Sequence, residues 1–448
     1  MFFKGTVIPF FLFSKFIIAF QKMVWYTTFM GNKYTFIDLF AGAGGLAEGF
    51  LKEGFEPLCH IEMNENACFS LKTRLSYYWL KNNGKINDYF DYCRNQISRE
   101  ELYKKIPDGI LDSVLNVAIS KDNLEEIFKT IDDNMLRKSA KQIDVLVGGP
   151  PCQAYSLAGR SSKRTNPLSD DSRNYLYELY VSFLHKYSPK LFIFENVVGL
   201  LSANNGKYFQ DFIAKSEKEG YKIEPRILNA KDYGVLQNRR RVIVIGAKKK
   251  EDAKKLFPDV VDSSQYVLED LFSDLPSLKN TLSSNKYRSG PSEYLSKFGI
   301  RDTNDVLTWH IRRTVNDRDT EIYKTTIRLW NTKKERLNYS KLPDELKNHR
   351  NQKSFLDRFK VVASDLHESQ TMLAHIAKDG HYFIHPDIKQ ARSISVREAA
   401  RIQSFPDSYF FEGNRSAAFI QIGNAVPPLL SWQMAKKIKE FLDRIKGV

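Results

Sequence analysis

One cysteine in this sequence stands in a turn that could make its thiol reactive. Cys152 follows the apolar run 143–147 and the four residues Gly-Gly-Pro-Pro, whose backbones are unusually free or unusually stiff. Most single cysteines are simply buried apolar residues. Here, however, nearby positive charge would lower the thiol pKa from about 8.5 toward the reactive thiolate, and we predict a nucleophile. The basic residues of the loop that follows are Arg160, Lys163 and Arg164.

A carboxylate and a run of arginines adjoin two other apolar runs. Glu195 stands where the run beginning at residue 191 ends, and a carboxylate is costly to bury there without a partner or a task. Arg239 and Arg241 lead into the run 242–247. Because strand side chains alternate, we expect these two arginines to face the same way. A solvated strand edge is the alternative interpretation of the arginines.

A glycine-rich turn and a later carboxylate predict a ligand that contains ribose. Gly42 and Gly44 follow a run that ends at Phe40, and glycines let the backbone approach a ligand closely. Glu62 comes twenty residues after Gly42, at the expected end of a second strand, where it could accept hydrogen bonds from ribose hydroxyls. The glycine spacing is not that of a dinucleotide site, which argues against a nicotinamide dehydrogenase. We predict S-adenosylmethionine; glycines that serve packing alone are the alternative.

The elements that must position these residues alternate along the chain. Runs of strand length at 34–40, 143–147, 191–197 and 241–247 alternate with helical segments such as 46–53 and 174–185. This pattern predicts an α/β fold, a doubly wound and mostly parallel sheet of Rossmann-like type, whose ligands lie beyond the carboxyl ends of the strands. We divide the chain into an N-terminal extension (1–30), a catalytic and cofactor-binding domain (31–250, with an inserted segment 72–140), a second, smaller domain (251–390) and a return to the first domain (391–448).

Composition points to a polyanionic partner. Lys and Arg number 68 against 53 Asp and Glu, a net charge of +15. Such an excess favours nucleic acid over a membrane surface, although lysine-rich solvated faces would give the same charge. The four cysteines lack zinc-site spacing and are too few for a disulfide framework, so we expect a reducing cytoplasm. Residues 1–30 are apolar but interrupted by Lys15; we predict a dispensable extension, with a membrane anchor as the alternative.

Taken together, these residues resemble the DNA cytosine-5 methyltransferases, of the type found in bacterial restriction–modification systems. The resemblance runs from about residue 34 to 440, and its most specific part is "PPCQ" followed some 40 residues later by "ENV". The matching blocks are "DLFAGAGG", "GGPPCQAYS", "DSRNYLYEL", "FENV", "QNRRR", "REAARIQSFPD" and "QIGNAVPP".

The resemblance implies a role for each candidate residue. Cys152 would add to C6 of a flipped-out cytosine, Glu195 would hold and protonate N3, and Arg241 with Arg239 beside it would anchor O2. Region 251–390 would be the target-recognition domain. Double-stranded DNA would be the substrate, a cognate restriction endonuclease would share the site, and the enzyme would be a monomer without a metal. The implied cofactor contacts are Phe40, Gly42, Gly44, Glu62, Leu176 and Asn424, and the implied DNA contacts are Gln153, Ser156, Arg160 and Thr371.

Two departures from the family pattern and two rival functions qualify these expectations. The acidic block that contacts adenine has no clear match, since "AISKDNLEEIF" is only a weak candidate, and the residues before Thr371 are changed. The rival enzyme is the tRNA cytosine-5 methyltransferase, whose Cys-Phe-Thr tripeptide is absent. The other rival is a catalytically silent DNA-binding relative, which would usually have lost Cys152, Glu195 and Arg241.

Overall fold

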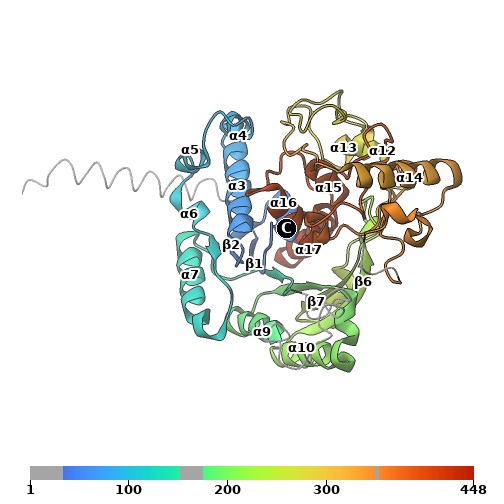
Figure 1. Ribbon diagram of the computed structural model, residues 1–448. Helices are drawn as coiled ribbons and strands as arrows, with labels where there is room; N and C mark the ends of the chain where they lie inside the picture. The colour runs from blue at the N-terminus through green and yellow to red at the C-terminus, as the bar shows by residue number, and fades with distance from the viewer. Residues whose placement is uncertain (1–33, 152–174, 349–352, 448) are drawn as a thin grey trace, which may run out of the picture.

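The computed structural model describes residues 34–151, 175–348 and 353–447. The candidates Cys152, Gln153, Ser156 and Arg160, and the extension 1–30, therefore lie outside the described residues. Within them, one seven-stranded sheet has the strand order β3-β2-β1-β4-β5-β7-β6 (Figure 1). The strands are β1 (Thr35–Leu39), β2 (Glu56–Glu62), β3 (Val114–Asn116), β4 (Val145–Gly148), β5 (Leu191–Asn196), β6 (Lys222–Asn229) and β7 (Arg240–Ala247).

The sheet is parallel from β3 to β5, whereas β7 runs antiparallel to both of its neighbours. The predicted doubly wound, mostly parallel α/β fold is thus confirmed. The reversed direction of β7 has a consequence for the site. Asn196, at the end of β5, pairs with Val242, near the start of β7. Residues that precede β7 are therefore brought to the same edge as residues that follow the parallel strands.

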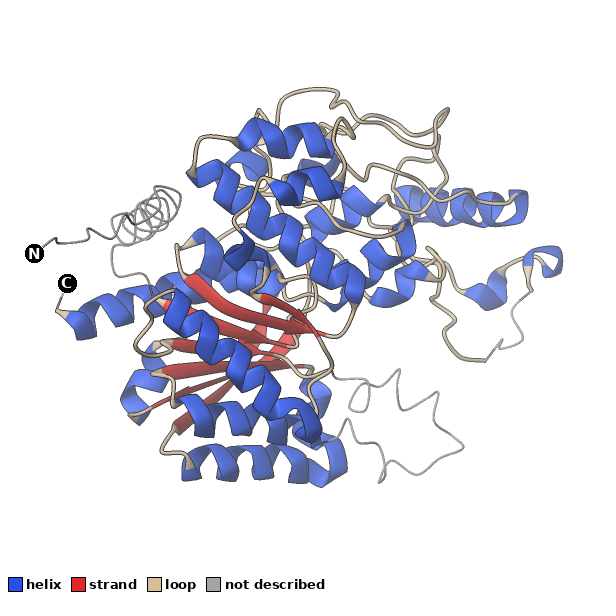
Figure 2. Cartoon of the chain, turned by 90° about the vertical axis from the view of Figure 1, so that its left-hand side faces the viewer, coloured by secondary structure: helices blue, strands red, loops and turns tan. Residues whose placement is uncertain are grey.

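Helices cover both faces of the sheet (Figure 2). Side chains of β5 alternate between two hydrophobic clusters: Leu191 and Ile193 belong to one, Phe192 and Phe194 to the other. A strand buried on both faces explains why these runs are continuously apolar in sequence. One cluster includes α2 (Gly45–Lys52), α15 (Val396–Ile402), α16 (Arg415–Asn424) and α17 (Pro428–Lys446), and the other includes α7 (Leu124–Arg137), α9 (Leu176–Tyr187) and α10 (Lys207–Lys218).

The segment 72–140, expected to be an insertion, is partly integral to this framework. Its strand β3 pairs with β2, and Asn134 of α7 donates a hydrogen bond to the Leu58 carbonyl at 3.0 Å. A smaller hydrophobic cluster joins the rest of the segment, including Tyr77, Tyr89 and Leu102. The helices around this cluster are α3 (Glu65–Asn82, which begins before the segment), α4 (Ile86–Cys93), α5 (Arg99–Lys104) and α6 (Asp108–Leu111).

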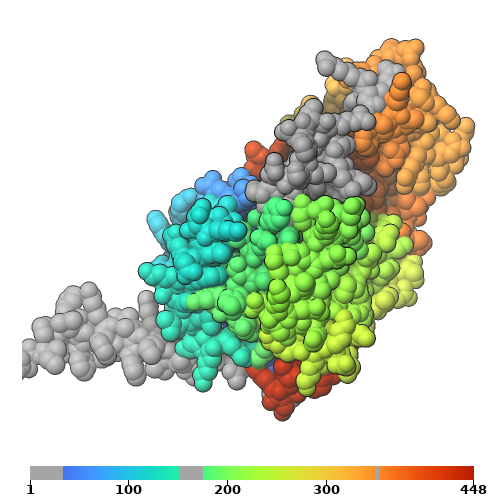
Figure 3. Space-filling model, turned by 90° about the horizontal axis from the view of Figure 1, so that it is seen from below, coloured from blue at the N-terminus to red at the C-terminus, as the bar shows by residue number. Residues whose placement is uncertain are grey.

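Residues 251–390 form a loop-rich region with short helices. Its first part packs into the main core through residues such as Leu271 and Leu295, whereas Ile327, Tyr339 and Phe359 belong to a separate cluster. The orange surface that includes α14 projects away from the green surface of the sheet domain (Figure 3). The helices are α11 (Lys250–Lys255, which begins just before the region), α12 (Glu269–Phe272), α13 (Glu293–Lys297) and α14 (Asp317–Lys333).

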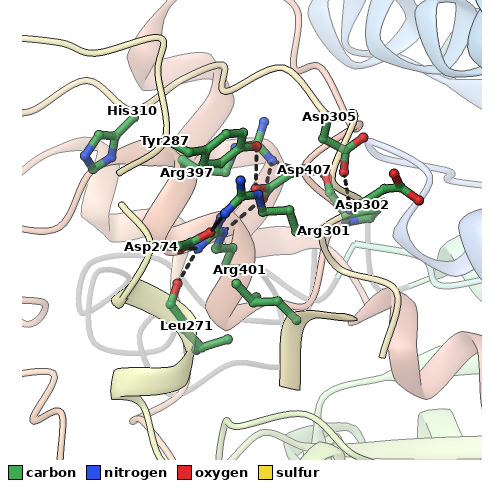
Figure 4. Close-up of polar contacts among 12 residues, drawn as sticks. Leu271, Asp274, Tyr287, Arg301, Asp302, Asp305, His310, Arg397, Arg401 and Asp407 are labelled. Carbon is green, nitrogen blue, oxygen red and sulfur yellow. Dashed lines mark hydrogen bonds and ion pairs between the residues drawn. The ribbon is translucent and has the colours of Figure 1, made fainter. Parts of the chain in front are cut away.

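Buried charges join the loop-rich region to the C-terminal helices (Figure 4). Arg401 of α15 is fully buried between Asp274 and Asp407, at closest distances of 2.5 and 2.6 Å. Tyr287 also donates to Asp407, at 2.8 Å. Although burial alone would raise the pKa of Asp407, the guanidiniums of Arg401 and Arg397 hold it below its usual value. A buried charge without its partner is strongly destabilising, so this cluster fixes the two parts together.

Candidate active site

The turn that precedes Cys152 packs against the end of β5. Gly148 of β4 pairs with Phe194 of β5, which places Gly149 next to Glu195. A Cβ atom on Gly149 would lie 2.7 Å from Glu195 Oε2, so glycine is needed for this close approach. Asn196 Nδ2 donates to the Pro150 carbonyl at 3.1 Å. The chain two residues before Cys152 is therefore fixed beside the Glu195 carboxylate.

Glu195 and Arg241 form an ion pair at this edge. Arg241 Nε lies 2.9 Å from Glu195 Oε1, and the two side chains are 13% and 14% exposed, so the pair is sheltered but reachable. Arg241 Nη1 also donates to the Arg240 carbonyl at 2.8 Å. Among the described residues, this ion pair uses one of the two carboxylate oxygens. Such a carboxylate keeps lone pairs for a ligand and, once protonated, can donate a hydrogen bond. The structure thus brings together two side chains 46 positions apart in the sequence.

Arg239 lies in a different environment from the one we expected. It is 1% exposed, and its guanidinium donates to the carbonyls of Met372 (2.7 Å), Ala425 (2.9 Å) and Gly423 (3.1 Å). β7 begins only at Arg240, so the alternation of strand side chains does not extend back to Arg239. These contacts replace the expectation that Arg239 faces the same way as Arg241 and anchors the base with it.

A second group of candidates surrounds the glycine-rich turn after β1. Phe40, Gly42 and Gly44 all have positive φ values, of 56°, 54° and 70°. Nothing lies within 4 Å of a Cβ built on Gly42, so its glycine serves backbone conformation and leaves open space beside it. At Gly44, by contrast, a Cβ would meet Leu71 Cδ2 at 2.6 Å.

Glu62 closes this turn from the end of β2. Its two oxygens accept hydrogen bonds from the backbone N–H groups of Gly42 and Asn64, each at 2.8 Å. Burial raises the pKa of Glu62, and the two N–H donors oppose that shift. Each oxygen uses one lone pair for these donors and keeps another for a hydroxyl. The carboxylate and the open space at Gly42 therefore fit a ligand with neighbouring hydroxyl groups.

The remaining described candidates are the side chains of Phe40, Leu176, Asn424 and Thr371. Phe40 and Leu176, the first residue of α9, are half-buried against the same hydrophobic cluster. Asn424 is exposed at the end of α16, between buried Gly423 and Ala425. Thr371 is half-buried, and its hydroxyl donates to the Asn238 carbonyl at 2.5 Å.

The segment after β3 has no acidic side chain directly at the strand end. Asn116 of β3 pairs with Glu62 of β2, so the following residues begin at the same edge. Asn123 holds this loop: its Oδ1 accepts from the Ser120 N–H at 2.9 Å and its Nδ2 donates to the Ala118 carbonyl at 2.8 Å. The weak candidate block therefore begins at Ala118, shortly after the end of β3, and its contact with adenine stays a prediction.

Sequence reasoning gave no role to Gly149, Asn196 or Gln237. The first two fix the turn beside Glu195, and buried Gln237 accepts a hydrogen bond from the Met372 N–H next to Thr371. The signal for the first two was their place at the ends of adjacent strands. Among the described residues, no group of three His, Cys, Asp or Glu side chains could hold a metal ion, and no helix is long and apolar enough to cross a membrane.

Comparisons with known proteins identify the family of this chain. The model of the family described as C-5 cytosine-specific DNA methylase matches residues 34–100 and 117–440. The chain is 38% identical to the type II methyltransferase M.Bpa9945I of Bacillus paralicheniformis, over 91% of this chain and 99% of that protein. It is 32% identical to the type II methyltransferase M.AgeI of Thalassovita gelatinovora, over 90% and 98%.

One solved structure supports the fold. A protein described as a prophage-encoded DNA modification methyltransferase (E. coli) aligns with a TM-score of 0.60 at 20% identity. The alignment covers 92% of this chain and 100% of that one. The likeness therefore extends over both the sheet and the loop-rich region.

Proposed function

Because the chain belongs to the C-5 cytosine-specific DNA methylase family, we propose that it methylates C5 of a flipped-out cytosine within a specific double-stranded DNA sequence. The methyl donor is S-adenosylmethionine, and the reaction passes through a covalent bond between Cys152 and C6. The observation that carries this proposal is the Glu195–Arg241 ion pair, packed beside the turn that leads to Cys152.

The base-binding residues make an unreactive carbon nucleophilic. Glu195 holds N3 and delivers a proton there, while Arg241 donates to O2, so the ring can accept electrons as the Cys152 thiolate adds to C6. The electron pair then lies at C5, which would take the methyl group as the sulfur–methyl bond of the donor breaks and leaves its electron pair on sulfur. Loss of H5 as a proton to a base or water restores the double bond and expels the thiolate, and N3 returns its proton to Glu195.

The glycine-rich turn supports the choice of methyl donor. Glu62 is placed for the ribose hydroxyls, Gly42 leaves open space, and Asn424 offers an exposed amide. Phe40, Gly44 and Leu176 complete the proposed contacts. When bound, S-adenosylmethionine supplies an activated methyl group on a sulfonium. The chain's own residues fix its ribose and keep the surrounding backbone in the required turn.

DNA binding is proposed for the loop after Cys152 and for the loop-rich region. C6 of cytosine is inaccessible in a stacked duplex, so the target base must be flipped out. Gln153, Ser156 and Arg160 would contact the displaced nucleotide or its strand, and Thr371 would contact DNA through the lone pairs left on its hydroxyl. The net charge of +15 favours such a partner. Residues 251–390 would choose the sequence.

The biological setting belongs to the same proposal. Relatives named as type II methyltransferases support a role beside a cognate restriction endonuclease, whose site the enzyme would protect. We propose that it acts as a monomer in the bacterial cytoplasm.

A covalent trap tests this function. DNA in which 5-fluorocytosine replaces cytosine should form a stable adduct with the protein in the presence of S-adenosylmethionine, because fluorine cannot leave as a cation and elimination is blocked. Cys152→Ser should form no adduct and transfer no methyl group. Cys93→Ser, the same substitution at a cysteine of α4 that has no proposed role, should behave as wild type. Adducts with tRNA alone would identify the tRNA enzyme, and DNA binding without an adduct would identify a silent relative.

A further inference from the structure

Three consecutive residues before β7 attach that strand to two other parts of the chain. We call Gln237, Asn238 and Arg239 the clamp. Gln237 is fully buried; its Oε1 accepts from the Met372 N–H at 2.8 Å, and its Nε2 donates to Gln403 Oε1 at 2.6 Å. The Asn238 N–H donates to the Ser369 carbonyl at 2.9 Å. The clamp therefore binds the segment that contains Thr371 at several successive residues.

Arg239 extends the clamp to the end of α16. Its Nη1 donates to Met372, while its Nη2 donates to the carbonyls of Gly423 and Ala425. These two carbonyls flank Asn424, the proposed cofactor contact. A second donor, Gln403 Nε2, reaches the Ala425 carbonyl at 2.5 Å. One buried guanidinium thus fixes the peptides on both sides of Asn424.

The two segments that Arg239 joins are also packed tightly together. A Cβ on Gly423 would lie 2.2 Å from the Ala374 backbone nitrogen, so no other residue would fit without a shift. The 372–374 backbone therefore packs directly against the residue that precedes Asn424. Arg241, which holds Glu195, follows Arg239 by two residues.

Arginine has the geometry that this junction needs. A buried cation is costly unless its donors are satisfied. The planar guanidinium presents its donors in a fixed fork, whereas an ammonium group is a compact point charge on a flexible stem. Lysine could keep the charge at residue 239 but would not present donors in the fixed fork that reaches the carbonyls of Met372, Gly423 and Ala425.

We infer that Arg239 is a positioning residue that couples the cofactor site at Asn424 to the DNA and base site at Thr371, Arg241 and Glu195. Occupation of either site stabilises the arrangement of the clamp that the other site requires. By thermodynamic linkage, DNA then strengthens cofactor binding by the same factor as the cofactor strengthens DNA binding. This inference rests on the proposed function for the identity of the two ligands.

The test is the ratio of two dissociation constants. S-adenosylhomocysteine, the non-reactive product, is titrated by calorimetry with the full chain alone and with saturating unmethylated duplex that contains the mapped target. For wild type we expect DNA to tighten binding by about 5- to 150-fold, the usual range of coupling between sites. Arg239→Lys and Arg239→Gln should bring this ratio close to one, whatever their effect on the affinity measured without DNA.

The control is Arg240→Gln, which removes an exposed neighbouring guanidinium and should keep the wild-type ratio. A purely structural role would lower the melting temperature and leave the ratio unchanged in the folded fraction, which would overturn the inference, as would a wild-type ratio of one. If Arg239→Gln does not fold, the ratio of dissociation constants is measured with Arg239→Lys and Gln237→Met, for which it should also be close to one. Absence of any binding to wild type without DNA would instead contradict the proposed cofactor.

Discussion

The carboxyl edge of the sheet and the loop-rich region 251–390 hold their charged side chains in different ways. At the edge, Glu195 has a partner from the neighbouring strand and a glycine packed against it. In the loop-rich region, Lys324 pairs with Glu321 of the same helix, and Lys347 with Asp344 three residues away. Bond-making requires groups held to within about half an ångström, which regular elements provide. Contacts to DNA phosphates position the protein and tolerate looser placement.

The two regions also differ in what joins them to the rest of the fold. The site residues depend on strand pairing, whereas the loop-rich region is fixed by the buried charges around Arg401. Changes at the edge of the sheet should therefore affect the rate of the reaction. Changes at Arg401 should affect the free energy of unfolding, and changes among the exposed cations should affect the DNA affinity. The predictions below test this separation.

Replacement of Glu195 by Gln should have the largest effect. The amide keeps the size of the side chain but cannot deliver a proton to N3, and general acid catalysis typically contributes about 10²- to 10⁴-fold. We expect kcat to fall by that factor with little change in DNA affinity. Single-turnover methyl transfer measures it, with exposed Glu251→Gln as the matched control. A kcat within threefold of wild type would contradict the proposed role of the carboxylate.

Replacement of Arg401 by Met should destabilise the protein rather than alter the chemistry. It leaves Asp274 and Asp407 buried without their shared guanidinium, a change that typically costs about 3–5 kcal/mol of unfolding free energy. Denaturant titration measures this cost, and exposed Lys255→Met should change it by no more than about 0.5 kcal/mol. A loss below 1 kcal/mol would show that the cluster does not fix the loop-rich region in place.

Replacement of Glu62 by Ala should weaken S-adenosylmethionine binding. Loss of a charge-assisted hydrogen bond costs about 1.5–3 kcal/mol, which corresponds to roughly 10- to 150-fold in the dissociation constant. Calorimetry without DNA gives the value, and circular dichroism verifies that the fold is retained. An unchanged dissociation constant would remove Glu62 from the cofactor site.

The raised pKa of Glu62 adds a pH dependence to that binding. A carboxyl group with a raised pKa takes up its proton at a higher pH than an ordinary glutamate. The carboxylate that accepts the ribose hydrogen bonds is therefore present at high pH and lost as the pH falls through that raised value. Wild-type affinity should decline on acidification before an exposed glutamate would titrate, and Glu62→Gln should show no such decline.

Neutralisation of exposed cations in the loop-rich region should have the smallest effect. The described structure shows no ion pair for Arg328, Lys333, Arg336 or Lys341, so these side chains are available for phosphates. Each Gln substitution should reduce the slope of log affinity against log salt by about one unit per lost contact, equally for all DNA sequences. Lys324→Gln and Lys347→Gln, which already have acidic partners, should reduce it less.

An exchange of the whole region 251–390 tests whether this region chooses the DNA sequence. A chimera that carries the corresponding region of a relative, if active, should methylate a different sequence, whereas the cation variants should methylate the original one. An unchanged sequence in the chimera would place recognition elsewhere, with the helices of segment 72–140 as the next candidate.

The sequence predicted the sheet and the site to different extents. β1, β4, β5 and β7 were predictable because strands buried on both faces are continuously apolar. The antiparallel direction of β7 was not, since hydrophobic pattern carries no information about strand direction. The position of Arg239 was misjudged for another reason: the sequence does not show that β7 begins only at Arg240. The cluster around Arg401 could not be predicted from the sequence either, because its members Asp274 and Asp407 are 133 residues apart along the chain.

Sequencing that detects 5-methylcytosine tests the central claim most directly. Genomic DNA from a host that expresses the full chain should carry 5-methylcytosine at one fixed position of one short sequence, and DNA from a host with Cys152→Ser should carry none. DNA without 5-methylcytosine from a host that contains the folded wild-type protein would contradict the account.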